Sequence, residues 1–131
     1  MTQALRLSFP ADPARLSCVR RSVRDFLGQV SASERTVEDV VLSLHEACKN
    51  AIRFGGAPVD IELELRVTPS RLCATVHDHG AGFDADFRCP GPANPRGRGL
   101  FLMSALMDDV QIDCTDGTTV TMSKSLTASA A

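Results

Sequence analysis

Residues 59–78 read VDIELELRVTPSRLCATVHD, and this stretch decides the fold class. Apolar and polar side chains alternate on both sides of the Pro69-Ser70 turn signal, which is the period of a half-buried β-strand. The segments 59–67 and 71–78 are therefore predicted to form a β-hairpin in the middle of the chain.

Two amphipathic helices are predicted before this hairpin. The first begins at Pro13 and is broken at Gly28, with apolar residues at helical spacing along one face. The second carries an apolar stripe from Val37 to Ile52 and is ended by the Gly55-Gly56 pair. Its candidate N-caps are Ser31 and Ser33. An alternating segment at residues 4–9 predicts a strand ahead of both helices.

The second half of the chain repeats this mixture of elements. Residues 79–99 are rich in glycine and proline, which indicates a long functional loop. Helical spacing resumes over 100–107, and a closing hairpin is predicted from 108–114 and 118–126, followed by a disordered tail at 127–131. Because hairpins dominate and the helices are segregated, the order favours a two-layer α+β sandwich over a doubly wound sheet.

Composition limits the classes of protein that the chain can be. Its 131 residues fit one domain, 1–131, and its net charge of −2 excludes the basic surface of a typical nucleic-acid binder. The apolar runs are too short to span a bilayer and no secretory signal is recognisable, so we expect a cytoplasmic protein. Five cysteines without a C-x-x-C pair argue against a disulfide framework and against a zinc site.

The first motif that carries chemistry lies on the second helix. Glu46 and Asn50 are four residues apart, so both occupy one face, away from the apolar stripe. A solvated polar face is the plain interpretation. The functional interpretation is a carboxylate that activates a nucleophile beside an amide oxygen that ligates magnesium.

The second motif is HDHGAG, which follows a predicted strand. Asp78 could accept a hydrogen bond from an exocyclic amine, and Gly80 and Gly82 would let a flat ring approach the backbone. An ordinary turn is the alternative.

The third motif opens the last helix. Free N–H groups at a helix N-terminus, with Gly97 and Gly99 allowing close approach and Arg96 and Arg98 adding charge, would cradle a phosphate. Leu100 follows as the first apolar residue of that helix. The segment is not a P-loop, because no Gly-Lys-Ser/Thr occurs in the chain.

Taken together and in this order, the motifs resemble the N, G1 and G2 boxes of the GHKL (histidine kinase-like) ATPase superfamily. The matching segments are LHEACKNAIRF, VHDHGAGF and PRGRGLFLMSALMDDV, and the ending DGTTVTMSK matches as well, so the resemblance covers nearly the whole chain. Within the superfamily, the chain is most similar to the anti-sigma factor serine/threonine protein kinases.

The resemblance implies a Bergerat-type fold, with a mixed sheet covered on one face by about three helices. It implies ATP and Mg²⁺ as cofactors and Glu46 as the general base toward a serine or threonine of a partner. It further implies that Asp78 binds adenine and that Asn50 holds magnesium. The remaining implied nucleotide contacts are Gly80, Gly82, Arg96, Gly97, Arg98, Gly99, Leu100 and Thr118.

The resemblance also implies protein partners: a sigma factor and a STAS-type anti-anti-sigma factor, bound alternately. Arg20, on the basic first helix, is the candidate contact, and a homodimer is possible. Lys49 departs from the family pattern and either pairs with phosphate or is solvated. His77 and His79 share one face of a strand end, where we expect exposed or hydrogen-bonded side chains rather than metal ligands.

Two further functions remain open beside the kinase. An anti-sigma module that sequesters its partner without catalysis would share the same boxes, although the presence of Glu46 favours the kinase. A histidine-kinase catalytic domain is disfavoured, because about thirty residues upstream leave no room for a helical hairpin with a phosphoacceptor histidine.

Overall fold

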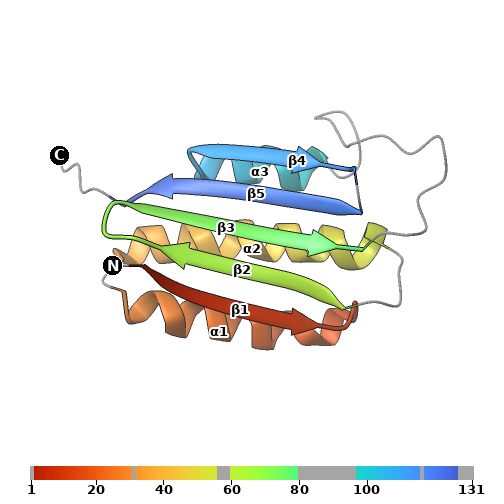
Figure 1. Cartoon of the computed structure of the whole chain (residues 1–131), viewed down its shortest axis with the longest axis horizontal. Coiled ribbons are helices and arrows are strands. Elements are labelled where there is room, and N and C mark those ends of the chain that lie inside the picture. Colours follow the sequence, from red (N-terminus) through yellow and green to blue (C-terminus); the bar gives the residue numbers. More distant parts are fainter. Residues whose placement is uncertain (1, 31, 56–59, 80–96, 116, 127–131) are drawn as a thin grey trace.

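A computed structural model describes residues 2–30, 32–55, 60–79, 97–115 and 117–126 (Figure 1). Within these ranges lie five strands and three α-helices. In chain order they are β1 (Gln3–Phe9), α1 (Leu16–Gly28), α2 (Glu34–Gly55), β2 (Ile61–Val67), β3 (Arg71–Asp78), α3 (Gly97–Leu106), β4 (Asp109–Asp113) and β5 (Thr118–Ser125). A single 3₁₀ turn, Pro13–Arg15, precedes α1. Every element predicted from periodicity is present.

The strands form one sheet in the order β1-β2-β3-β5-β4, and each neighbouring pair is antiparallel. The expectation of a mixed sheet is therefore wrong. The connections explain why the sheet is antiparallel. The helices α1 and α2 together return the chain to the end of the sheet where β1 finished, so β2 runs opposite to β1. β3 and β4 run in the same direction, but β5 lies between them, so no parallel pair forms.

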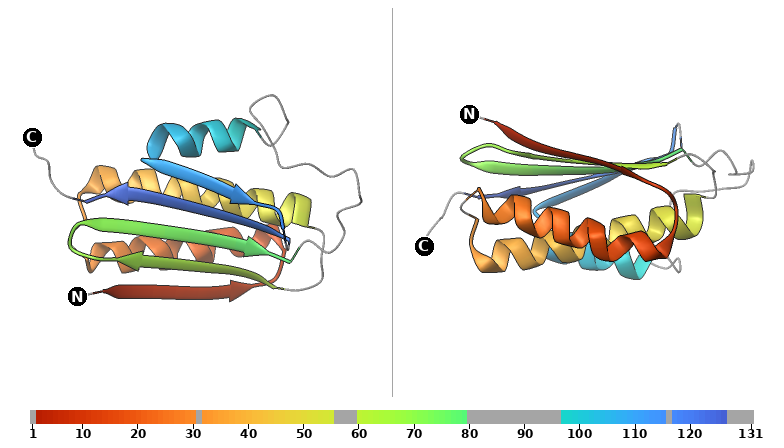
Figure 2. Two further views of the ribbon diagram at one scale, coloured as in Figure 1. Left: turned by 45° about the horizontal axis from the view of Figure 1, so that its top comes forward. Right: turned by 90° about the horizontal axis from the view of Figure 1, so that it is seen from below.

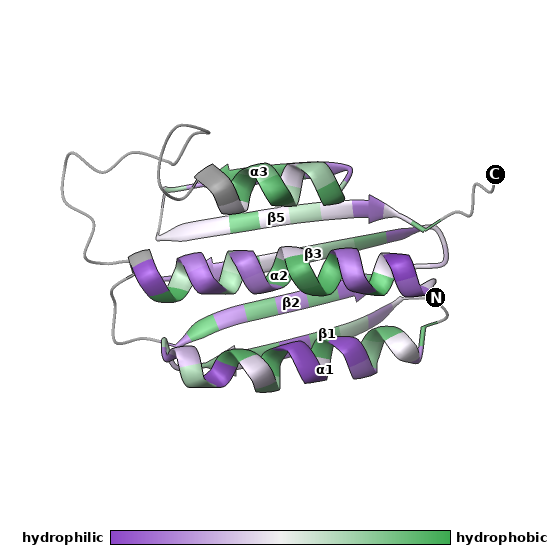
Figure 3. Cartoon of the chain, turned by 180° about the vertical axis from the view of Figure 1, so that it is seen from behind, coloured by the Kyte–Doolittle hydropathy of each residue, from purple (hydrophilic) through white to green (hydrophobic). Residues whose placement is uncertain are grey.

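The molecule has two layers, as the sequence predicts. The three helices cover one face of the sheet, and the other face carries no helix among the described residues (Figures 2 and 3). Side chains of β3 alternate strictly between these faces: Leu72, Ala74, Val76 and Asp78 are buried, and the residues between them are exposed or half-buried. The two faces of β3 therefore meet different surroundings.

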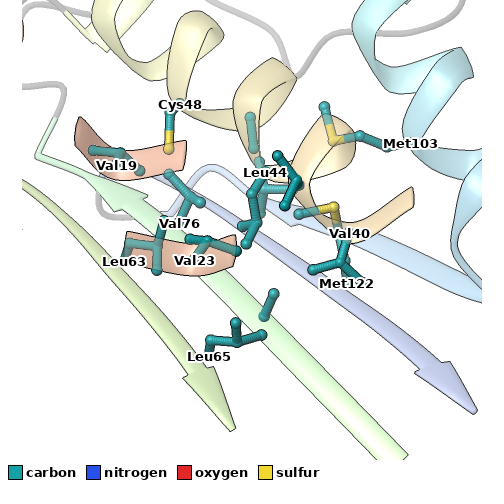
Figure 4. Packing of buried hydrophobic residues seen from close by; sticks show 14 of the residues in the cluster. Val19, Val23, Val40, Leu44, Cys48, Leu63, Leu65, Val76, Met103 and Met122 are labelled. Atoms are coloured by element: carbon teal, nitrogen blue, oxygen red, sulfur yellow. The ribbon is translucent and has the colours of Figure 1, made fainter. Parts of the chain in front are cut away.

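The core lies between α2 and the centre of the sheet (Figure 4). Leu44 of α2 is 1% exposed and packs in one cluster with buried side chains of β2, β3, α3 and β5. The members drawn from those elements include Leu63, Leu65, Val76, Met103 and Met122. The apolar stripe of α2 is thus the main helical contribution to the core.

Local signals fix the helix ends. The Asp12 carboxylate accepts a hydrogen bond from the Ala14 N–H (3.0 Å) at the start of the 3₁₀ turn. Ser33 Oγ accepts one from the Thr36 N–H (3.1 Å) and so caps α2; Ser31, the other candidate, lies outside the described residues. The helices end at Gly28 and Gly55, as predicted.

The cysteines differ from the expectation in one case. Cys48 is fully buried as a small apolar residue, and burial raises the pKa of its thiol to about 12. Cys18 and Cys73 are free thiols, whereas Cys114 is disulfide-bonded, which the odd cysteine count did not indicate. Among the described helices, none is long and apolar enough to cross a bilayer.

Two leucines of α2 give a matched test of this packing. Leu44→Ala removes a fully buried side chain and should lower the free energy of unfolding by about 2–5 kcal/mol. Leu42 is 41% exposed on the same helix, so Leu42→Ala should change it by about 0.5 kcal/mol or less. Urea denaturation measures both, and equal losses would contradict the assignment of the core face of α2.

Candidate functional site

Asp78 and Thr118 lie side by side at the edge of the helix-covered face. They are partners in the β3–β5 register, and each is 6% exposed. Thr118 Oγ1 is buried and has no hydrogen-bond partner among the described residues. A buried hydroxyl left in this state costs free energy unless water or a ligand satisfies it, so Thr118 is a candidate ligand contact beside Asp78.

A small pocket of about 20 Å³ opens beside this pair. Its walls come from α2, β3, α3, β4 and β5, and they include Asn50, Asp78, Leu100 and Thr118. The space takes about one water-sized group, such as an amino group. Apolar walls with a buried carboxylate and hydroxyl at one end suit a group that is flat and apolar but carries a hydrogen-bond donor.

Glu46 and Asn50 meet the first turn of α3. A Cβ placed on Gly99 would lie 3.0 Å from Glu46 Oε1 and 3.2 Å from Asn50 Nδ2, so glycine allows a closer approach than a larger residue would without a small shift of these side chains. The Glu46 side chain is consequently only 14% exposed. The interpretation of this helix face as simply solvated is therefore wrong, because α3 covers it.

Lys49 is exposed to solvent, as one of the two sequence alternatives expected, and it also forms an ion pair within its own helix. Its Nζ lies 3.1 Å from the Glu46 carboxylate, one helical turn away, while half of its side chain remains exposed. The i, i+3 spacing was the signal that could have predicted the pair. The Glu46 carboxylate is thus paired with a cation whose side chain is half exposed.

Arg20 links α1 to the same helix turn. Its Nη1 lies 3.1 Å from His45 Nδ1, a contact between residues 25 positions apart. Partial burial lowers the pKa of His45 below its usual 6.5, and the positive charge of Arg20 lowers it further. His45 is therefore held neutral between Arg20 and the chain neighbour Glu46.

Gly117 holds the other side of the site together. Its φ is +72°, a conformation that favours glycine, and a Cβ there would collide with the carbonyl oxygen of Asp78. The turn before β5 can therefore close directly onto the end of β3. This contact fixes the backbone that carries the Asp78 carboxylate.

The structure brings together the described residues that the sequence motifs singled out: Glu46, Asn50, Asp78, Gly99, Leu100 and Thr118. Gly97 opens α3 as expected, and the side chain of Arg98 is not described. Gly80, Gly82 and Arg96 lie outside the described residues, as does the tail at 127–131.

Known proteins match this sequence over nearly the whole chain. A family model described as a histidine kinase-like ATPase domain matches residues 9–124. The chain is 29% identical to the serine-protein kinase RsbW of Bacillus velezensis and 28% identical to that of Bacillus subtilis. Each match covers 93% of this chain and 85% of the relative.

Solved structures share the fold. A crystal structure of the RsbU and RsbW domains of a Mycobacterium tuberculosis protein superposes with a TM-score of 0.75 at 23% identity, covering 93% of this chain and 31% of that one. A histidine kinase domain from Erythrobacter litoralis superposes with a TM-score of 0.59 at 19% identity, covering 91% of this chain and 62% of that one.

The surroundings of His45 can be tested by its titration. Its imidazole should titrate below 6.5; Arg20→Ala should raise that pKa, and Glu46→Gln should lower it, because the carboxylate favours the charged ring. NMR chemical shifts of the His45 ring against pH measure this pKa in the parent and in both variants. Since the folded state disfavours the proton, stability should also fall as pH drops below about 6.5. Shifts in the same direction for both variants would contradict the geometry.

Proposed function

The chain belongs to the histidine kinase-like ATPase family, and on this premise we propose that it is an ATP-dependent serine/threonine protein kinase. Relatives at 28–29% identity over 93% of the chain carry the name serine-protein kinase RsbW. The observation that carries the proposal is the placement of Glu46 and Asn50 against Gly99, beside the pocket that Asp78 and Thr118 close.

The pocket has room for the amino group of an adenine base. In the proposal, the Asp78 carboxylate accepts a hydrogen bond from the adenine amino group, and Thr118 Oγ1 gains the partner that it lacks among the described residues. A carboxylate and a hydroxyl together favour adenine, which presents both a donor and a ring acceptor.

The other end of the site suits phosphate. The N–H groups at the start of α3 point away from the helix and can donate to phosphate oxygens, and Gly97 and Gly99 allow close approach. We assign Arg96 and Arg98 as additional positive charge there. Gly80 and Gly82 would line the approach to the base.

Magnesium completes the proposed site. The amide oxygen of Asn50 is the kind of hard donor that Mg²⁺ prefers. The Asn50 side chain lies next to the first turn of α3. When bound, the ion would neutralise charge on the phosphates.

Glu46 is the proposed general base. Its carboxylate would accept the proton from the hydroxyl of an incoming serine or threonine as that oxygen attacks phosphorus. The covering contact with α3 keeps this carboxylate mostly out of water, and Lys49 balances its charge. The chain would therefore position and deprotonate the nucleophile rather than form a covalent intermediate itself.

The proposed partners are a sigma factor and a STAS-type anti-anti-sigma factor, so that the protein would regulate transcription in the cytoplasm by partner switching. Arg20 is the proposed contact residue, as part of the basic surface of α1. Because its guanidinium reaches His45, a partner bound there would lie next to Glu46. Sequestration without catalysis is the alternative, and it uses the same surface.

Nucleotide binding should depend on the buried carboxylate. Asp78→Asn replaces a charged acceptor with a neutral amide whose single oxygen accepts more weakly from the adenine amine, so affinity for Mg²⁺-ATP should fall by roughly 1–3 kcal/mol. Asp109→Asn, an exposed aspartate on β4, is the matched control and should bind like the parent. Calorimetry measures both, and unaltered binding by Asp78→Asn would exclude this adenine contact.

Phosphoryl transfer should depend on Glu46 while nucleotide binding does not. Glu46→Gln should keep ATP affinity but slow transfer to the antagonist protein by roughly 100- to 10,000-fold, because the amide cannot accept the proton. Glu34→Gln, at the exposed start of the same helix, serves as control.

Single-turnover assays with a co-purified STAS-type antagonist measure the rate. Full activity of Glu46→Gln would show that another residue is the general base. Partner binding by the parent without any ADP formation would instead support sequestration.

A further inference from the structure

A second cluster of chemically active side chains lies on the open face of the sheet, away from the pocket. Glu62 of β2 faces His77 of β3 directly in the strand register, and His79 follows the end of β3. Since side chains alternate along a strand, His77 and His79 flank Asp78 and point to the face opposite to it. The cluster is therefore separate from the proposed nucleotide site.

The three side chains converge. One potential ligand atom from each lies within 4.8 Å of the other two. His79 Nε2 is 3.6 Å from Glu62 Oε1, and the two imidazole rings meet edge to face with centroids 4.5 Å apart. The ligand atoms of a tetrahedral zinc ion lie about 3.3 Å apart, which follows from bonds of about 2.0–2.2 Å.

Small side-chain movements would close the remaining gap. The Glu62 side chain is 60% exposed, so its carboxylate can move toward both rings without displacing packed atoms. His77 and His79 are only half-buried. The strand backbones need not shift, because the register already sets Glu62 opposite His77.

His77 is already oriented as metal-bound histidines are. Its Nδ1 lies 2.6 Å from Thr119 Oγ1 on the neighbouring β5, which leaves Nε2 as the nitrogen available to an ion. A hydrogen bond at the second ring nitrogen orients the ring plane, and this support is usual behind histidine ligands.

The site is also accessible. A hollow of about 440 Å³ on the open face is lined by side chains of β1, β2 and β3, among them Glu62 and His77. An ion could enter from solvent, and water could occupy a fourth coordination position.

We propose that Glu62, His77 and His79 form a binding site for a divalent transition metal ion, of which Zn²⁺ is the best match. Two imidazoles and one carboxylate are borderline donors that suit Zn²⁺ and its neighbours, whereas Mg²⁺ and Ca²⁺ prefer oxygen donors alone. Exposed or hydrogen-bonded histidines are the expectation from sequence alone, because the position of Glu62 opposite His77 depends on the strand register.

The test is metal binding by the untagged full chain. Titration calorimetry with Zn²⁺ should give one ion per chain. Absorption of the Co²⁺-loaded protein should show tetrahedral d–d bands without a thiolate charge-transfer band. A thiolate band would assign binding to a cysteine and overturn the proposal.

Variants locate the site. His79→Ala and His77→Ala should each weaken Zn²⁺ binding by more than tenfold, and Glu62→Gln by about tenfold. His45→Ala removes the third histidine of the chain and is the matched control, which should bind Zn²⁺ like the parent. Circular dichroism checks that each variant is folded. Failure of the parent to bind Zn²⁺ at micromolar concentration, or equal binding by His79→Ala and the parent, would leave only an ion pair between Glu62 and His79 and overturn the proposal.

Discussion

The alternation of side chains along β3 is the constraint on which both faces of this molecule depend. One set of side chains enters the core beneath α2 and ends with the Asp78 carboxylate, and the other set lines the open face and ends with the histidines. A shift of one residue in the β2–β3 register would exchange the two sets, placing imidazoles in the apolar layer. Core packing and the chemistry at the strand end are therefore set by the same register.

The contact between α2 and α3 is the second element that shapes the site. A helix turn that presents Glu46 and Asn50 would be solvent-exposed on an isolated helix, and here α3 covers it closely at Gly99, which has no side chain. Covering leaves a carboxylate in a less polar environment, where its charge interacts more strongly with nearby groups. Lys49 and the Arg20–His45 pair are the nearby groups that respond to that charge.

The elements of the fold were predictable, because each depends on a local period. Hydrophobic repeats located every strand and helix, and the order of the motifs located Glu46, Asn50 and Asp78. The antiparallel sheet was missed because periodicity says nothing about which strand lies beside which; the insertion of β5 between β3 and β4 decides that. The burial of Glu46 was missed for a similar reason. A helical wheel shows the faces of one helix and does not show which other helix covers them. The Arg20–His45 and Glu62–His79 contacts join distant residues and leave no local pattern.

Gly117 also limits how this sequence can vary. Its side-chain position is filled by the carbonyl of Asp78, and its backbone adopts a conformation that other residues rarely take. Two independent restrictions thus act on a residue that offers no functional group to any ligand. In a survey of tolerated substitutions, position 117 should accept as little variation as a residue that touches substrate. Its contribution is the absence of a side chain, which leaves room for the Asp78 carbonyl group.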